Sequence, residues 1–191
     1  SPYCATSCFK IISRRVVDAL KEQGLSTSDI GVIATYASQV DSLRNGIGRI
    51  LRGTPEGREV LKELFPNVDS VDGFQGDQRN YVFMSFTRSN TKGDVGFTDE
   101  ESRINVGISR AADHLVIVGD TSTLIDRNQD PVSRARFAIL KQLVAQYGEV
   151  REIKFESRRR KRDRDPAKRR ARRKKAKARD AARGYKYKFE R

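Results

Sequence analysis

The segment SVDGFQGDQRNYVFMSF (residues 70–86) decides how the rest of this sequence is interpreted. It passes through a glycine-rich turn around Gln75 and continues into an apolar run from Tyr81 to Phe86. A short apolar run bounded by turn residues is typical of a strand that is buried on both faces of a parallel sheet. The glycines favour a tight turn ahead of that strand.

Strands and helices alternate on both sides of this segment. Short apolar runs predict strands at 30–36, 68–71, 81–86 and 114–120. Helical spacing of apolar residues predicts helices at 9–23, 38–51, 56–65, 102–112 and 131–147. This order is typical of an α/β fold with a mostly parallel sheet. In such sheets function collects in loops beyond the carboxyl ends of the strands, and the segments 36–39 and 73–79 both follow predicted strands.

The positive charge of the chain is concentrated in its last residues. The 191 residues carry a formal charge of +14, and residues 157–191 alone hold 19 Lys and Arg against 4 Asp and Glu. Residues 1–156 are near neutral and numerous enough to bury a core, whereas the tail has almost no large aliphatic side chains. We therefore predict a domain over residues 1–156 and a basic low-complexity tail, disordered or helical, over residues 157–191.

Two features exclude whole classes of function. No run of about 18 apolar residues is present, so the sequence predicts no membrane span. A single histidine, His114, leaves no histidine cluster for a metal site.

Two arginines, Arg103 and Arg110, lie seven residues apart, near one face of the helix predicted at 102–112. On spacing alone, this pair is more typical of a solvated helix face than of a binding site.

Four segments, taken in order, resemble the superfamily 1 helicases. GVIATYASQ (31–39) resembles motif IV, SVDGFQG (70–76) motif V, SFTRSN (85–90) the S-x-x-R-x-N segment, and RINVGISRA (103–111) motif VI. The resemblance covers residues 11–120. It points to the C-terminal RecA-like domain of the branch that includes the nonsense-mediated-decay helicase, and it implies the RecA-like (P-loop NTPase) three-layer sandwich.

The resemblance implies a role for each matching residue. In these motors ATP lies between two RecA-like domains, and a guanidinium from the second domain stabilises the charge that develops on the transferred phosphoryl group. Arg110 matches this catalytic arginine finger. The implied ATP-binding residues are Tyr36, Gln39, Gly73, Gln75, Gly76, Gln78 and Arg110. Ser70 and Arg88 are implied to bind a single strand of RNA or DNA.

The groups that hold ATP and Mg²⁺ in this family are missing from the sequence. It contains neither a GxxxxGK[ST] segment nor a D-E-x-x segment after a strand. We therefore expect an N-terminal RecA-like partner domain of the same protein to hold both, and the chain alone to be inactive as an ATPase. Gln78 replaces a glutamate of motif V, and Ala112 replaces a second arginine of motif VI. These departures keep open a non-catalytic, helicase-derived nucleic-acid-binding module.

The basic tail is a second candidate for nucleic-acid binding. Each phosphate that it neutralises releases counterions, and the aromatics of YKYKF (185–189) can stack on unpaired bases. The predicted contacts are Arg158, Arg159, Arg160, Lys161, Lys168, Arg169, Arg170, Arg172, Arg173, Lys174 and Lys175. The same clusters resemble a two-part nuclear import signal, which favours a nuclear over a cytoplasmic location. A solvated tail with non-specific attraction, or one that binds acidic proteins, is the alternative.

Overall fold

The computed structural model describes residues 2–153, except residues 54, 75, 87 and 97–100. In chain order its elements are α1 (Pro2–Lys21), the 3₁₀ turn η1 (Thr27–Asp29), β1 (Ile30–Ala34), α2 (Ala37–Leu51), α3 (Pro55–Leu64), the 3₁₀ turn η2 (Phe65–Asn67), β2 (Val68–Ser70), β3 (Arg79–Phe86), α4 (Glu101–Ile108), β4 (Ala111–Gly119), the π-helical turn η4 (Ser122–Asp126) and α5 (Pro131–Tyr147). The predicted tail at 157–191 lies outside the described residues.

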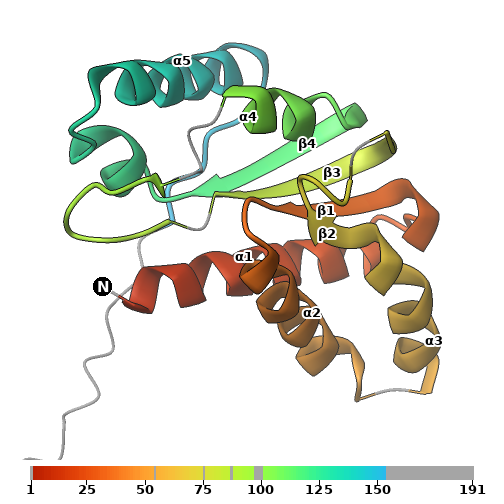
Figure 1. The fold of residues 1–191 in the computed structure, drawn as a ribbon. Helices are drawn as coiled ribbons and strands as arrows, with labels where there is room; N and C mark the ends of the chain where they lie inside the picture. The colour runs from red at the N-terminus through yellow and green to blue at the C-terminus, as the bar shows by residue number, and fades with distance from the viewer. Residues whose placement is uncertain (1, 54, 75, 87, 97–100, 154–191) are drawn as a thin grey trace, which may run out of the picture. The chain divides into compact units, whose positions relative to one another are not determined.

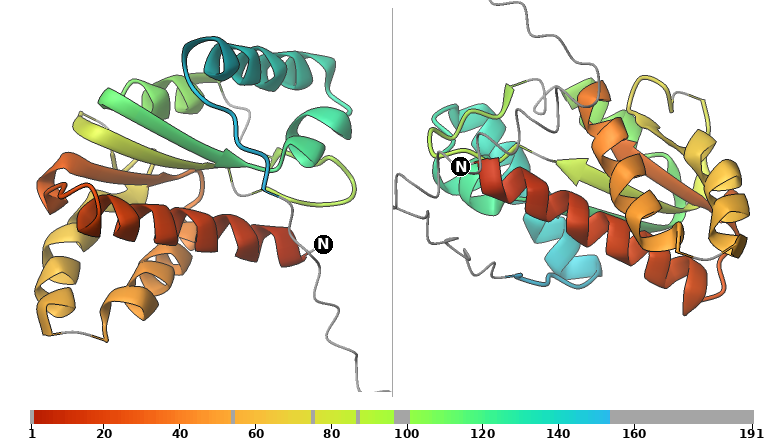
Figure 2. Two further views of the ribbon diagram at one scale, coloured as in Figure 1. Left: turned by 180° about the vertical axis from the view of Figure 1, so that it is seen from behind. Right: turned by 90° about the horizontal axis from the view of Figure 1, so that it is seen from below.

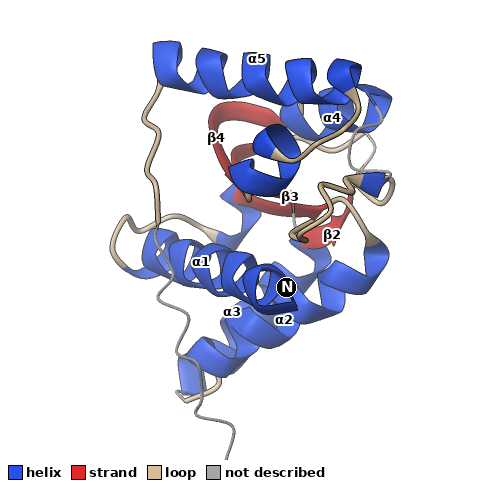
Figure 3. Cartoon of the chain, turned by 90° about the vertical axis from the view of Figure 1, so that its left-hand side faces the viewer, coloured by secondary structure: helices blue, strands red, loops and turns tan. Residues whose placement is uncertain are grey.

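The four strands form one parallel sheet in the order β2-β1-β3-β4. Helices α1, α2 and α3 cover one face, and α4 and α5 cover the other (Figure 1). Figure 2 shows α1 lying along one face of the sheet, and Figure 3 shows the strands between the two helical layers. The predicted α/β, RecA-like three-layer architecture is therefore confirmed.

The core consists of two hydrophobic clusters, one on each face of the sheet. Val32 and Ala34 of β1 face the cluster under α1, α2 and α3. Ile33, between them, faces the cluster under α4 and α5, which also holds Phe74 and Phe137. All five residues of β1 are buried, as expected for a central parallel strand covered on both sides.

One element boundary differs from its prediction in a way that matters for function. The helix predicted at 102–112 ends at Ile108, and β4 begins at Ala111. Arg110 is therefore not on the helix with Arg103, which corrects the prediction that both share a helix face. The physical reason is strand pairing: the backbone N–H of Arg79, where β3 begins, donates to the carbonyl of Arg110 at 2.9 Å. This parallel pairing extends β4 toward α4, and α4 is correspondingly shorter than predicted.

Candidate nucleotide and nucleic-acid site

The carboxyl ends of β1, β2 and β3 bring together three predicted residues. Ala34 pairs with Ser70 and also with Ser85, so Tyr36, Ser70 and Arg88 lie at the same edge of the sheet. The Nε of Arg88 donates to the hydroxyl of Tyr36 at 3.3 Å. Its guanidinium carbon lies 5.1 Å from the centroid of the tyrosine ring, a cation–π distance. A cation is thus fixed at this edge although the two residues are 52 positions apart.

Two further polar groups at this edge are held by local hydrogen bonds. The Oγ of Ser70 accepts from the backbone N–H of Gly73 at 3.2 Å. The Oε1 of Gln39 accepts from the hydroxyl of Thr35 at 3.4 Å. Because the serine oxygen acts as an acceptor in this bond, its own O–H stays available to a phosphate oxygen.

An unusual connection joins β2 to β3. Both strands are parallel and lie on either side of β1, yet only residues 71–78 link them. Parallel connections normally need a dozen or more residues. Phe74 crosses β1 directly above Gly31, and a Cβ on Gly31 would lie 2.8 Å from its ring. The lack of a side chain at Gly31 therefore permits this short crossover segment.

The crossover segment divides the predicted ATP-binding residues between two edges of the sheet. Gly73 lies near the carboxyl end of β2, whereas Gly76 and Gln78 lie toward the amino end of β3. The sequence had suggested that residues 73–79 form a loop beyond the carboxyl ends of the strands. Only the first part of this segment lies there. Gly76 has φ +93°, which favours glycine. Gln75 lies outside the described residues.

Arg110 packs against the far end of the crossover segment. Its Nη1 donates to the main-chain carbonyl of Asp77 at 3.3 Å, its Nε to the carbonyl of Val106 at 3.1 Å, and its Nη2 to the hydroxyl of Ser109 at 3.1 Å. A guanidinium has five N–H donors, so two of them have no hydrogen-bond partner among the residues that the structure describes. Three hydrogen bonds therefore hold the guanidinium of Arg110 in one orientation.

Arg103 contacts the same segment from within α4. Its Nη2 lies 3.3 Å from the carboxylate of Asp72. Arg103 and Arg110 therefore both hold the crossover segment, one at each end, although only the first is on a helix. The surface that joins the two arginines is a loop and not a helix face.

Arg79 is a residue that the sequence reasoning missed. Its Nη2 donates to the side-chain oxygen of Asn67 at 2.9 Å, and its guanidinium carbon lies 5.7 Å from the centroid of the Phe74 ring. Its Nη1 also donates to the carbonyl of Gln78 at 2.7 Å. The position of Arg79 directly after the glycine-rich turn could have indicated its role from the sequence. Arg79 fixes the path of the crossover segment beside Arg110.

Asp120 closes the carboxyl edge beside Arg88. Its Oδ2 accepts from the hydroxyls of Ser89 at 2.6 Å and Thr123 at 2.8 Å. Partial burial raises the pKa of Asp120, but these bonds, the N–H of Ser122 and the charge of Arg127 outweigh it. The pKa of Asp120 therefore lies below its ordinary value, and its ionised form holds the segment after β3.

The described residues offer no metal site and no membrane element. Within residues 2–153 and outside the gaps, no three His, Cys, Asp or Glu side chains lie together where a metal could bind. In the same part of the chain, none of the helices has the length and apolarity that a membrane span requires.

Comparisons with known proteins agree with the fold. A family model described as an AAA domain matches residues 7–122. The DNA-binding protein SMUBP-2 of Rattus norvegicus is 37% identical over 138 residues, which are 71% of this chain and 12% of that protein. The DNA polymerase alpha-associated DNA helicase A of Saccharomyces cerevisiae is 34% identical over 113 residues, 59% of this chain and 15% of that protein.

A third relative is the regulator of nonsense transcripts 1 homolog of Arabidopsis thaliana, 34% identical over 110 residues, 58% of this chain and 8% of that protein. The chain thus spans a small fraction of the length of these relatives. The family match nevertheless covers more than half of the chain, including all four strands and both arginines. The chain therefore belongs to the superfamily 1 helicases, in the branch that includes the regulator of nonsense transcripts 1, and carries a helicase-type domain of that family.

Proposed function

We propose that this chain is the C-terminal RecA-like half of an ATP-dependent helicase. In this proposal Arg110 is the arginine finger that completes an ATP site on an N-terminal RecA-like domain. The observation that carries the proposal is the position of Arg110, which is held by the carbonyls of Asp77 and Val106 and the hydroxyl of Ser109, with two donors that have no partner among the described residues.

The chemistry assigned to Arg110 is electrostatic. Bound Mg·ATP supplies the phosphoryl group whose transfer to water drives domain movement. A guanidinium that is already oriented toward the developing negative charge needs no reorganisation during the reaction, which is how such donors lower a barrier. Because Asp77 and Val106 fix the guanidinium, little of its rotational freedom remains to be lost. The crossover segment would place Gly76 and Gln78 beside it, while Tyr36 and Gln39 as nucleotide contacts stay predictions.

The carboxyl edge is our candidate for the nucleic-acid grip. Arg88 is fixed over Tyr36, and Ser70 keeps a hydroxyl donor at the same edge. Hydroxyl, guanidinium and backbone donors are the groups that contact phosphates in nucleic-acid complexes. The basic tail at 157–191 would add affinity that does not depend on sequence, and its clusters would also serve as a nuclear import signal. The nucleic acid, RNA or DNA, is part of this proposal.

A second function is favoured by two specific residues. Gln78 and Ala112 stand where this family usually has a glutamate and an arginine, and three internal acceptors hold Arg110. If Arg110 serves only to brace the crossover segment, the chain is a non-catalytic nucleic-acid-binding module.

The first test of the proposal is the reading frame upstream of the codon for Ser1. A continuous frame that encodes GxxxxGK[ST] followed by a D-E-x-x segment supports the helicase. A stop codon or an unrelated segment overturns it and leaves the binding module.

A kinetic test then separates the two functions in a protein that contains both halves. We expect Arg110→Ala to lower kcat for nucleic-acid-stimulated ATP hydrolysis by about a thousandfold, the usual worth of such a finger. Arg134→Ala, an exposed arginine of α5, is the matched control and should leave kcat unchanged. An Arg110→Ala protein with full ATPase activity would assign Arg110 a purely structural role.

A further inference from the structure

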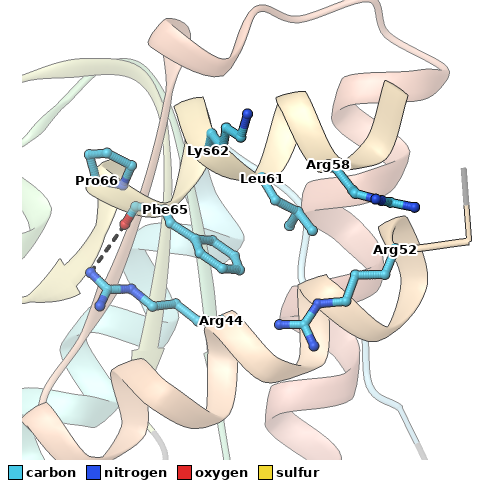
Figure 4. Close-up of a pocket in the computed structure, with 7 residues that line it drawn as sticks. All are labelled: Arg44, Arg52, Arg58, Leu61, Lys62, Phe65 and Pro66. Carbon is cyan, nitrogen blue, oxygen red and sulfur yellow. Dashed lines mark hydrogen bonds between the residues drawn. The ribbon is translucent and has the colours of Figure 1, made fainter. Parts of the chain in front are cut away.

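A pocket between α2 and α3 is not used by the site described above. It is an open hollow of about 640 Å³, lined by Arg44, Arg52, Arg58, Leu61, Lys62, Phe65 and Pro66 (Figure 4). It belongs to the helical layer of α1, α2 and α3, whereas Arg110 follows α4 in the opposite layer (Figure 1). Ligand pockets usually enclose about 300–1,000 Å³, so this one has room for a large side chain and its flanking backbone.

Arg44 builds one end of the pocket. Its Nη2 donates to the carbonyl of Phe65 at 3.1 Å and to that of Val68 at 2.8 Å. These bonds fix the turn between α3 and β2 against α2. The Nε of Arg44 is buried and has no hydrogen-bond partner among the described residues. Arg44 is therefore an ordered cation at this end of the pocket.

The rim carries two cations whose charge is not neutralised. Arg52 and Arg58 are exposed, and neither lies within 4.0 Å of a carboxylate in the described part of the chain. Lys62, by contrast, pairs with Glu59 at 2.8 Å. Figure 4 shows Arg52 and Arg58 on the same side of the pocket, at the end away from Pro66. Two like charges at one end favour an anionic group between them.

The floor of the pocket is apolar. Leu61 is 6% exposed, and Phe65 is partly buried and packs against the core cluster under α1, α2 and α3. Figure 4 shows the ring of Phe65 directed into the pocket. An apolar floor beneath a cationic rim matches a ligand with an apolar side chain next to a carboxylate.

The charges on α3 decide between two anionic polymers. Besides Arg58 and Lys62, the helix exposes Glu56, Glu59 and Glu63. A nucleic-acid strand carries a phosphate on every nucleotide, so a strand lying along α3 would bring phosphates close to these carboxylates. A peptide can place its carboxylates at Arg52 and Arg58 alone, where guanidinium–carboxylate pairing is favourable.

We propose that the α2–α3 pocket binds a short acidic peptide segment of a partner protein, with one large apolar side chain on Phe65 and Leu61 and flanking carboxylates on Arg52 and Arg58. Docking of an apolar anchor between two helices is a recurrent mode of peptide recognition. This partner site is independent of ATP and of the nucleic-acid grip.

The test uses the full chain and two fluorescein-labelled octapeptides at about 0.15 M salt. In the first, Phe-Leu is flanked on each side by one acidic residue, with neutral residues at the four other positions; in the second, Ala-Ala replaces Phe-Leu. Fluorescence anisotropy reports the Kd of each. The pocket variant is Arg52→Gln with Arg58→Gln, and the matched control is Arg14→Gln with Arg15→Gln, which removes two exposed cations from α1. Thermal unfolding of both variants confirms that each is folded.

The basic tail will attract both peptides, so the comparison between the peptides carries the result. We expect the Phe-Leu peptide to bind wild-type protein about tenfold more tightly than the Ala-Ala peptide, and the pocket variant to lose this preference while the control keeps it. A preference that survives in the pocket variant overturns the proposal. It is also overturned if an oligonucleotide of thymidines displaces the Phe-Leu peptide from wild-type protein and its own binding weakens in the pocket variant but not in the control, because the pocket would then bind nucleic acid.

Discussion

The guanidinium of Arg110 donates a hydrogen bond to the main-chain carbonyl of Asp77, with Nη1 and the oxygen 3.3 Å apart. The two residues are 33 positions apart and meet because β3 and β4 are parallel neighbours that begin side by side. One side chain thus joins the turn before β3 to the turn before β4. Any function of Arg110 in phosphoryl transfer is superimposed on this structural role.

The structural role of Arg110 predicts a loss of stability in Arg110→Ala. The substitution removes three hydrogen bonds and leaves the carbonyls of Asp77 and Val106 without this donor. We expect the free energy of unfolding, measured by urea denaturation, to fall by about 1–3 kcal/mol. Arg134→Ala should change it by less than about 0.5 kcal/mol. Equal unfolding midpoints for the two variants would show that the bonds of Arg110 contribute nothing measurable.

The close approach of Phe74 to Gly31 predicts that Gly31→Ala is destabilising. The new Cβ would lie 2.8 Å from the Phe74 ring, and overpacking of this kind costs about 1–3 kcal/mol. In Gly31→Ala/Phe74→Leu we expect part of this loss to be recovered, so that the double-mutant cycle shows coupling. Gly53→Ala is the control, because its Cβ would meet no described atom within 4 Å. Additive effects of the Gly31 and Phe74 substitutions would contradict the contact.

The hydrogen bonds of Asp120 predict a pH-dependent contribution to stability. Because the folded-state pKa lies below the ordinary value of 3.8, the ionised carboxylate stabilises the fold above that value, and this contribution is lost as the pH falls through the folded-state pKa. We expect Asp120→Asn to be less stable than wild type near neutral pH and the difference to shrink in acid. Urea unfolding from about pH 7 to about pH 2.5 measures it.

Asp113→Asn provides the matched control for Asp120→Asn. Asp113 is exposed on β4, and its carboxylate makes no hydrogen bond or ion pair with the residues that the structure describes. Its substitution removes the same charge without the bonds to Ser89 and Thr123. If Asp113→Asn and Asp120→Asn have identical pH profiles of stability, the loss of stability is caused by the change in net charge and not by the loss of the hydrogen bonds.

The charge of the tail predicts a strong salt dependence of nucleic-acid binding. The association constant for single-stranded nucleic acid should fall as the salt concentration rises. The slope of log K against log salt should be roughly −0.7 for each phosphate that the protein neutralises. We expect removal of residues 157–191 to make this slope much shallower and to leave the weaker contacts of the carboxyl edge. Filter binding to a labelled oligonucleotide over a salt series measures both slopes. Identical slopes with and without the tail would exclude it as the main contact.

Several elements follow from the sequence alone because their physical causes are local. The run IGVIA predicts a strand buried on both sides, and β1 is buried along its whole length. The helix predicted at 131–147 is α5, and the structure shows the carboxylate of Asp130 capping it by accepting from the N–H of Val132 at 3.0 Å. The motif order across residues 31–111 was sufficient to predict the family and the three-layer fold.

The arrangement of the candidate site was decided by contacts between distant parts of the chain. Pairing of β3 with β4 ended α4 at Ile108 and placed Arg110 in a turn, which helical spacing could not predict. The short crossover over Gly31 moved Gly76 and Gln78 to the edge opposite Tyr36. The sequence alone determined which residues form strands and helices, because the spacing of apolar residues and the capping of helices depend on residues only a few positions apart. Only tertiary strand pairing and packing determined which of the candidate residues meet, because those contacts join segments that the sequence separates by 30 positions or more.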